Sequence, residues 1–234
     1  MNIGRSLFWF KDGDNKLNEF DDNFFALGTL LNRLLNQKYE GKRIKFINLD
    51  LSTDQTYQLY PMLPKDTPYY FGGYLRYYGT FDIRVFKSLT FAEQNRYVWD
   101  KAHDYLCKAA IFLKNTRLAE AAEYAYQKGL EINLNADYRL VEAEFFLSGQ
   151  KLKAAVWVNF KEDAMYSKLT LEKSGVVVFE KDIDKTKKGI EFFLEMYKSI
   201  EWENNNIIIK GVKDVQYLPL KVSLKGVLSD LGNG

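Results

Sequence analysis

The stretch YRLVEAEFFLSGQKLKAAVWVNF, residues 138–160, decides the fold because many of its apolar side chains recur at every second position. A period of two is typical of strands that bury one face. Two further segments continue this pattern: MYSKLTLE (165–172) and VVVFEK (176–181). Turns that contain Gly149 and Gly175 join consecutive segments, and such short joins favour antiparallel pairing. The sequence therefore predicts a four-strand antiparallel meander over residues 137–182.

Before the meander, the apolar period changes to three and four residues, which is typical of helices with one buried face. One such pattern runs from Leu17 to Leu35. Two more helices are expected over about 90–114 and 116–133, and Thr90 and Glu93 stand in capping-box spacing at the start of the first. Because the two helices follow each other closely, we expect them to form a central helix hairpin.

The second arm of this hairpin contains AAEYAYQKGLEINLN (121–135), which resembles the second helix of a tetratricopeptide repeat. The matching residues are Tyr126, Lys128, Leu130, Glu131, Ile132 and Asn135. Gly129 and Leu134 stand where the repeat has Ala and Pro, and the sequence contains no second copy. Such repeats need neighbours to complete a core, so we interpret the segment as one arm of an ordinary helix hairpin.

The remaining apolar segments are short. Strands are expected at SLFWF (6–10), KRIKFINLDL (42–51), TFDIRVF (80–86), IIIKGV (207–212) and VQYLPLKVSL (215–224), and a helix after Asp184. Pro219 cannot donate to a strand ladder, so the last strand should lie at an edge. This order of elements indicates an α+β fold, an antiparallel sheet packed with helices, rather than a parallel, doubly wound sheet. We expect one domain over residues 1–234.

The composition argues against several classes of function. The 33 basic and 31 acidic residues leave a formal charge of +2, too little for the broad positive field of a nucleic-acid binder. Cys107 is the only cysteine, so no intramolecular disulfide can form, as suits a reducing compartment. The apolar run Leu7–Phe10 is too short for a signal peptide or a membrane span. We expect a cytoplasmic protein without nucleic-acid or membrane partners.

His103 and Cys107 are the first candidates for chemistry, because they lie four residues apart on a predicted helix and share a face. A structural zinc site needs about four ligands, and the chain has one residue of each kind. The apolar neighbours of Cys107 indicate a packing role instead of a reactive thiolate.

Carboxylates are the second candidates. Asp12 and Asp14 follow an apolar strand, but the spacing of a calcium-binding loop is missing. Glu142 and Glu144 project to one side of their strand, which is also the pattern of a half-exposed strand. No catalytic residue, metal site or cofactor is predicted. A metal-dependent enzyme that uses these dispersed carboxylates remains the alternative function.

PYYFGGYLRYYGTF, residues 68–81, holds five tyrosines and two phenylalanines. Its prolines and glycines indicate irregular backbone, which tends to run over the surface. Adjacent aromatic residues in extended chain point to opposite faces, so some of them should be exposed. The hypothesis is a partner-binding surface made by Tyr69, Tyr70, Phe71, Tyr74, Arg76, Tyr77 and Tyr78. Complete burial of these rings in a core is the competing interpretation.

Taken with the sparse reactive groups, this segment favours a non-enzymatic protein that binds another protein. A bacterial immunity protein that neutralises a cognate toxin is the concrete form of this expectation, since such proteins are commonly single domains of this size and rich in aromatics. The near-neutral charge argues against one variant, an acidic mimic that blocks a basic nuclease site. The oligomeric state stays open.

Overall fold

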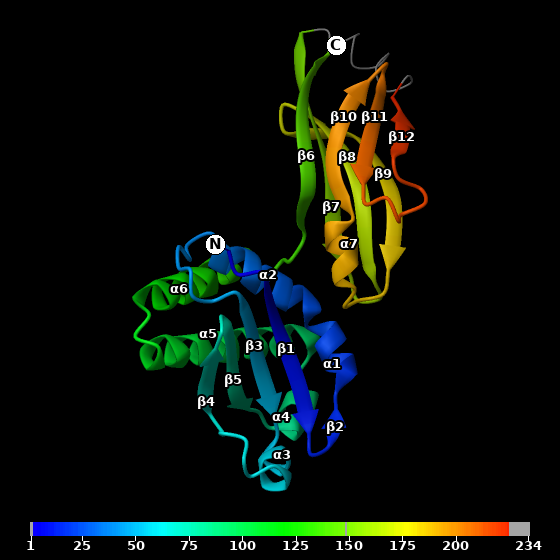
Figure 1. Cartoon of the computed structure of the whole chain (residues 1–234). Coiled ribbons are helices and arrows are strands. Elements are labelled where there is room, and N and C mark those ends of the chain that lie inside the picture. The colour runs from blue at the N-terminus through cyan, green and yellow to red at the C-terminus, as the bar shows by residue number, and fades with distance from the viewer. Residues whose placement is uncertain (1, 148, 225–234) are drawn as a thin grey trace. The chain divides into compact units, whose positions relative to one another are not determined.

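The computed structural model describes residues 2–147 and 149–224. Its contacts divide the chain into two compact units, Met1–Ala136 and Asp137–Gly234. The first unit combines a sheet with most of the helices, and the second is built almost entirely of strands (Figure 1). Helices and strands together make an α+β protein, as the sequence predicts. Whether the units unfold as one domain stays a prediction.

A five-stranded sheet forms the centre of the first unit, in the order β2-β1-β3-β5-β4. Its strands are β1 (Arg5–Asp12), β2 (Asn15–Lys16), β3 (Phe46–Ser52), β4 (Thr67–Phe71) and β5 (Tyr74–Thr80). β1, β3 and β5 are parallel, whereas β2 and β4 pair antiparallel at the two edges. The sequence analysis did not predict these parallel pairs.

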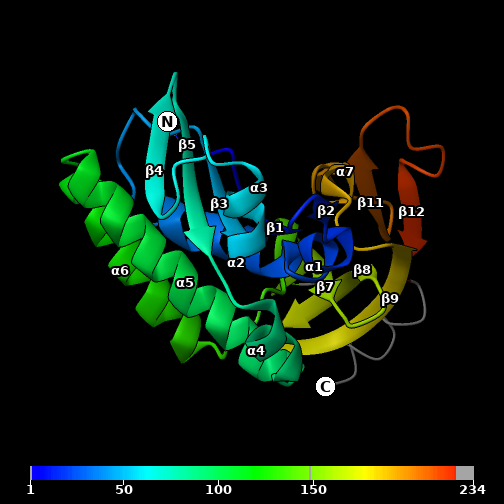
Figure 2. The same ribbon diagram turned by 90° about the horizontal axis from the view of Figure 1, so that it is seen from below.

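Among its described residues the first unit has six helices: α1 (Asn18–Asn23), α2 (Phe25–Asn36), α3 (Asp54–Leu59), α4 (Ile83–Ser88), α5 (Phe91–Phe112) and α6 (Thr116–Glu131). The longer ones, α2, α5 and α6, form a layer on one face of the sheet (Figure 2). α2 contacts β1 and α6, and α5 contacts β4, β5 and α6. Figure 2 shows α5 and α6 side by side, which confirms the predicted helix hairpin. We call the opposite face of the sheet, where β1, β3 and β5 present Trp9, Asp50 and Tyr78 in register, the open face.

Aromatic rings fill the core between the sheet and the helices. The Phe10 ring lies 5.3 Å from Phe24 and 5.7 Å from Phe86 between centroids. Tyr77 of β5 stacks on Tyr105 of α5 at 4.4 Å. These contacts explain why the helices select one face, since alternate residues of each strand supply the buried rings.

Gly129 lets the two arms of the helix hairpin approach closely. A Cβ atom at this position would lie 2.3 Å from the Trp99 ring, nearer than any real Cβ contact. The Trp99 indole N–H donates to the Tyr126 carbonyl at 3.2 Å, which holds the ring against α6. Gly129 therefore has a packing reason, and the tetratricopeptide pattern is not needed to explain it.

Two local predictions are wrong, and a third holds only in part. Residues 80–86 are not a strand: Asp82 caps a helix there by accepting from the N–H groups of Arg84 and Val85. The tyrosine-rich segment is not irregular but forms the β4–β5 hairpin, whose turn uses Gly72 and Gly73 at φ of +58° and +92°. The helix after Asp184 covers only Glu191–Glu195, because the chain enters a strand at Tyr197.

The second unit contains the predicted meander. It consists of β6 (Tyr138–Leu147), β7 (Gln150–Phe160), β8 (Met165–Lys173) and β9 (Val176–Thr186), paired antiparallel in this order. A second sheet holds β10 (Tyr197–Glu203), β11 (Asn206–Gly211) and β12 (Leu220–Ser223), preceded by the short α7 (Glu191–Glu195). β12 lies at an edge, as predicted, but it begins after Pro219 and is shorter than the expected strand over residues 215–224.

The two sheets of the second unit are joined by side chains. Phe145 of β6 stacks on Trp202 of β10 at 4.7 Å between ring centroids. The hydroxyl groups of Ser167 and Tyr197 lie 2.7 Å apart in the buried interior. Both sheets thus share one core, which covers the apolar face that the meander pattern predicts.

Candidate functional site

A cavity of about 460 Å³ opens in the first unit at the open face of the sheet. Its polar wall consists of Lys11, Lys16, Asp21, Asn48, Asp50 and Arg76, and its aromatic wall includes Trp9, Tyr60, Tyr74 and Tyr78. We call it the face cavity. Three parallel strands place these side chains together, because the register sets Trp9 opposite Asp50 and Asp50 opposite Tyr78. Volumes of this size suit small-molecule ligands.

Asp50 is the most buried charged residue of the face cavity, with only 5% of its surface exposed. Its Oδ2 accepts from the Arg76 Nε–H at 2.8 Å. Its Oδ1 is buried and accepts no hydrogen bond from any residue that the structure describes. Burial raises the pKa of the Asp50 carboxyl despite the attraction of Arg76 and Lys11. Burying a carboxylate oxygen without a hydrogen bond costs free energy, so a hydrogen-bond donor from a bound molecule would stabilise this group.

Asp21 is the second carboxyl of the face cavity and comes from α1. Its Oδ1 accepts from the Phe10 backbone N–H at 2.7 Å, which ties the short helix to β1. Burial raises the pKa of Asp21 to about 6, and the charges of Asp22 and Asp50 act in the same direction. Asp21 therefore titrates just below neutral pH.

Two lysines complete the polar wall. Lys11 Nζ lies over the Tyr60 ring, 3.9 Å from its centroid. Lys11 and Lys16 form no ion pair with any carboxylate in the part of the chain that the structure describes. Together with Arg76 they give the wall three cationic side chains against two acidic ones. The face cavity thus carries a small positive excess that its own residues do not neutralise.

The structure divides the predicted partner-binding residues between the two faces of the sheet. Tyr77 is fully buried in the core against Tyr105, and its hydroxyl donates to the Asp66 carbonyl. Tyr70 lies on the same side and donates to the Arg43 carbonyl at 2.8 Å. The others share the open face: Tyr69, Phe71, Tyr74, Arg76 and Tyr78. Adjacent tyrosines do point to opposite faces, as the extended chain requires.

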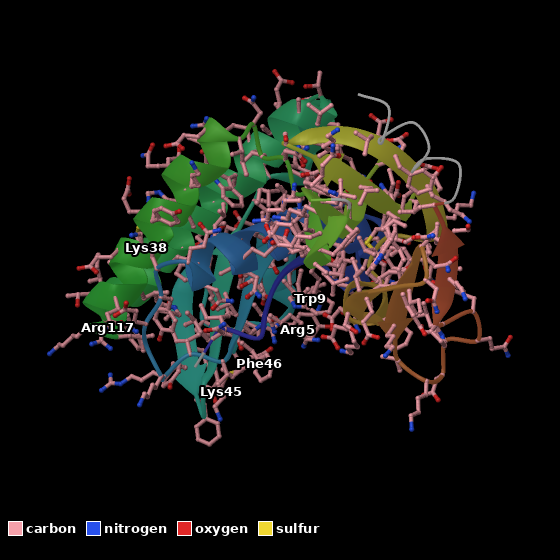
Figure 3. All side chains as sticks on the ribbon, turned by 90° about the horizontal axis from the view of Figure 1, so that it is seen from above. Arg5, Trp9, Lys38, Lys45, Phe46 and Arg117 are labelled. Atoms are coloured by element: carbon pink, nitrogen blue, oxygen red, sulfur yellow. The ribbon has the colours of Figure 1, made fainter. Side chains whose placement is uncertain are left out.

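Large aromatic side chains lie exposed on the open face. Phe71 is 74% exposed and Tyr69 49%, and both belong to the edge strand β4. Phe46 and Trp9, from β3 and β1, are 43% and 40% exposed. The guanidinium of Arg5 lies 5.9 Å from the centre of the Phe46 ring, and both side chains are labelled in Figure 3.

The carboxylates considered for catalysis are held in separate pairings. Asp12 accepts from the Thr53 hydroxyl at 2.7 Å, and Asp14 accepts from the Tyr60 hydroxyl. In the second unit, Glu142 pairs with Arg139 and Lys153, and Glu144 with Lys151. Across residues 2–147 and 149–224, no three His, Cys, Asp or Glu side chains are grouped to hold a metal ion.

A second cavity of about 470 Å³ lies near the carboxyl ends of β1, β3 and β5. Asp12, Asp54, Asp82, Arg84 and Lys101 line it. Asp82 is occupied as the cap of α4, and the hydrogen bonds from the Arg84 and Val85 N–H groups lower its pKa. None of these charged residues is buried, and no buried side chain there lacks a partner among the described residues.

His103 and Cys107 do meet on one face of α5. The Cys107 Sγ lies 3.4 Å from the His103 Nε2, which also lies 2.9 Å from a carboxylate oxygen of Glu123. The His103 ring stacks on Tyr126. Burial raises the pKa of the Cys107 thiol, and nearby Glu123 and Asp104 add to the effect. The pair therefore lacks the depressed thiol pKa of a nucleophile.

The sequence analysis missed Trp9, Lys11, Lys16, Asp21 and Asp50 as site residues. The one usable signal was in β3, where Asn48 and Asp50 alternate with the apolar Ile47 and Leu49 on a strand that is mostly buried. Polar side chains in a row on a buried strand indicate that the second face of the strand is polar and that these side chains need hydrogen-bond partners.

Comparisons of the chain with models of protein families, with curated proteins and with solved structures found no match. None of the helices among the described residues is long and apolar enough to cross a membrane.

Proposed function

We propose that this chain is a non-enzymatic protein whose function is to bind another protein on the open face of its five-stranded sheet. One observation carries the proposal: Trp9, Phe46, Tyr69 and Phe71 lie exposed on the same sheet face, although each could have been buried. Exposed aromatic clusters are typical of protein interfaces, where rigid rings give wide contact at low entropic cost. The sheet beneath them supplies a rigid platform.

Charge around these rings favours an acidic partner. The loop before β3 contains Lys42, Arg43 and Lys45, and Arg5 starts the neighbouring strand. Figure 3 places Arg5 and Lys45 beside Phe46. Basic residues at the rim of an apolar patch speed association with a negatively charged surface and make its rate depend on salt.

Within this class, the concrete proposal is a cytoplasmic bacterial immunity protein that occludes a cognate toxin. The size of the chain, the abundance of aromatics and the separate pairing of its carboxylates support this form. The proposal places no chemistry in the chain, because occlusion needs only contact surface. The cognate toxin should then present acidic residues around an apolar patch.

Site-specific photo-crosslinking in the producing cell tests the binding face. A photoreactive phenylalanine analogue replaces Phe71 or Tyr69, and a matched control carries it at Ile111 or Phe112, which are 78% and 60% exposed on α5. We expect one protein to be crosslinked from the open-face positions and not from the α5 positions. Equal crosslinking from both surfaces, or none from the open face, refutes the proposal.

Co-expression tests the immunity form separately. The crosslinked protein is expressed in a sensitive host with the wild-type chain or with the double variant Tyr69→Ser/Phe71→Ser. Protection by the wild type and death with the variant support neutralisation by this face. A partner that is harmless when expressed alone excludes the toxin role while leaving protein binding intact.

A further inference from the structure

The face cavity has the composition of a small-molecule site as well as a position on the proposed interface. We propose that it binds a small organic phosphate, a ring compound that carries hydroxyl or N–H donors together with a phosphate group. Nucleotides and sugar phosphates share this chemistry. The inference goes beyond the proposed function, because it requires no protein partner.

Asp50 has a carboxylate oxygen without a hydrogen-bond donor in the described chain. The carboxylate sits in the middle of β3 with its Oδ2 on Arg76 and its Oδ1 buried without a partner in the described chain. An O–H or N–H group of a ligand in the cavity would supply the missing hydrogen bond. Arg76, 37% exposed in its side chain, keeps further N–H donors for a ligand oxygen. Neighbouring acceptor and donor groups suit the hydroxyl groups of a ribose or a hexose.

The wall of the face cavity has more cationic than acidic side chains. Lys11 and Lys16 come from β1 and β2, which adjoin each other at Lys11 and Lys16 in the strand register. Both line the cavity, and neither forms an ion pair with a carboxylate among the described residues, although Lys11 attracts Asp50 and Lys16 attracts Asp21 from a longer distance. Two lysines held side by side on one edge suit a phosphate, which accepts charge-assisted hydrogen bonds from both.

Aromatic rings form the rest of the wall of the face cavity. Trp9 is 40% exposed and Tyr60 39%, so each offers ring surface to the cavity. Tyr74 is fixed by a hydrogen bond from the Asn48 side-chain amide, and Tyr78 by the Arg76 guanidinium 5.0 Å from its ring centre. Fixed rings beside polar groups are typical of pockets that orient a flat ligand. The volume of about 460 Å³ admits a single nucleotide or sugar phosphate.

Calorimetric titration of the full chain tests the inference. One panel holds the nucleoside 5′-monophosphates and a second holds pentose and hexose phosphates, so that the two panels distinguish the sources. Adenosine, glucose and inorganic phosphate are the counterparts that lack one part of the chemistry. We expect saturable binding from one panel, with the uncharged counterpart weaker by about tenfold or more, as loss of a charge-assisted hydrogen bond predicts.

Three cavity variants and one control variant locate the binding site. Lys16→Gln and Lys11→Gln should each lower the affinity for the organic phosphate by about tenfold. Lys87→Gln, which changes an exposed lysine on α4, should leave this affinity unchanged. Asp50→Asn should lower the affinity for the same ligand and for its uncharged counterpart by the same factor. A cooperative thermal unfolding transition shows that each variant is folded. Because Lys16 is exposed, Lys16→Gln should fold even if Asp50→Asn does not.

Absence of binding by both panels overturns the inference. An equal loss of affinity in Lys87→Gln and Lys16→Gln also overturns it. The same holds if inorganic phosphate binds as tightly as the organic phosphates. Either result indicates an unspecific charge effect. Because no partner protein is present, these results leave the crosslinking test of the proposed function untouched. A failure of the crosslinking test likewise leaves the titration interpretable.

Discussion

Asp21→Asn should stabilise the protein at neutral pH and do little at acidic pH. The Asp21 carboxyl has a pKa of about 6 in the folded protein against an ordinary value of 3.8, chiefly because of burial. The folded state therefore holds this proton more tightly than the unfolded chain. Stability from the protonated carboxyl is present below the unfolded pKa of 3.8 and is lost as pH rises through about 6. At neutral pH the folded protein carries an unfavourable charge there.

The expected gain in the free energy of unfolding follows from the raised pKa of Asp21. A change of about two pKa units corresponds to about 3 kcal/mol at 1.36 kcal/mol per unit. Because Asp21 is only partly buried, solvent screening should reduce the effect to roughly 1–2 kcal/mol. Asparagine keeps an oxygen that can accept from the Phe10 N–H, so the tie between α1 and β1 should survive.

Urea unfolding measures the free energy of unfolding of wild type and variant near pH 8 and near pH 4. Glu19→Gln is the matched control, because it removes one negative charge from an exposed position of the same helix. We expect a gain for Asp21→Asn at the higher pH, most of which vanishes at the lower pH, and a control within about 0.5 kcal/mol of wild type. A gain of equal size at both pH values would mean that ionisation of Asp21 is not its cause.

Three further predictions use the same urea assay. Gly129→Ala should cost about 1–3 kcal/mol, because the added methyl group meets the Trp99 ring; a neutral effect would show that the helix hairpin can open freely. Thr90→Ala should cost about 1 kcal/mol by removing the cap of α5, and full stability would contradict the capping box. Tyr77→Ala should cost about 3–5 kcal/mol as a buried ring, whereas Tyr69→Ala should change stability by less than about 1 kcal/mol; similar losses would refute the assignment of the two tyrosines to opposite faces.

The sequence predicted those elements whose signals are local. The meander β6–β9 follows from alternation and short turns, and the start of α5 follows from Thr90 and Glu93 three residues apart. Pairing of consecutive strands needs no distant partner, so the pattern alone is enough. Residues 80–86 failed because alternation of Phe81, Ile83 and Val85 looks like a strand, while the cap at Asp82 starts a helix.

The parallel sheet and the face cavity could not be predicted in this way. β1 and β3 are separated by two helices, and neither strand carries a local sign of its partner. Asp50, Trp9 and Arg76 meet only because the register of three strands aligns them. The tyrosine-rich segment shows the same limit of local patterns. Alternation predicted that Tyr77 and Tyr78 point to opposite faces, but it did not predict which of the two enters the core.

Asp50 shows that the polar row of β3 is a guide to function that is independent of the exposed aromatics. Burying an ion pair gains little stability, because desolvation of both charges offsets their attraction, and well-packed apolar residues often do better. The unfilled Oδ1 makes the balance worse, since its desolvation is not recovered within the described chain. A strand selected for stability alone would carry an apolar residue opposite Trp9. Retaining a buried carboxylate at this point is therefore most simply explained by a group that it binds.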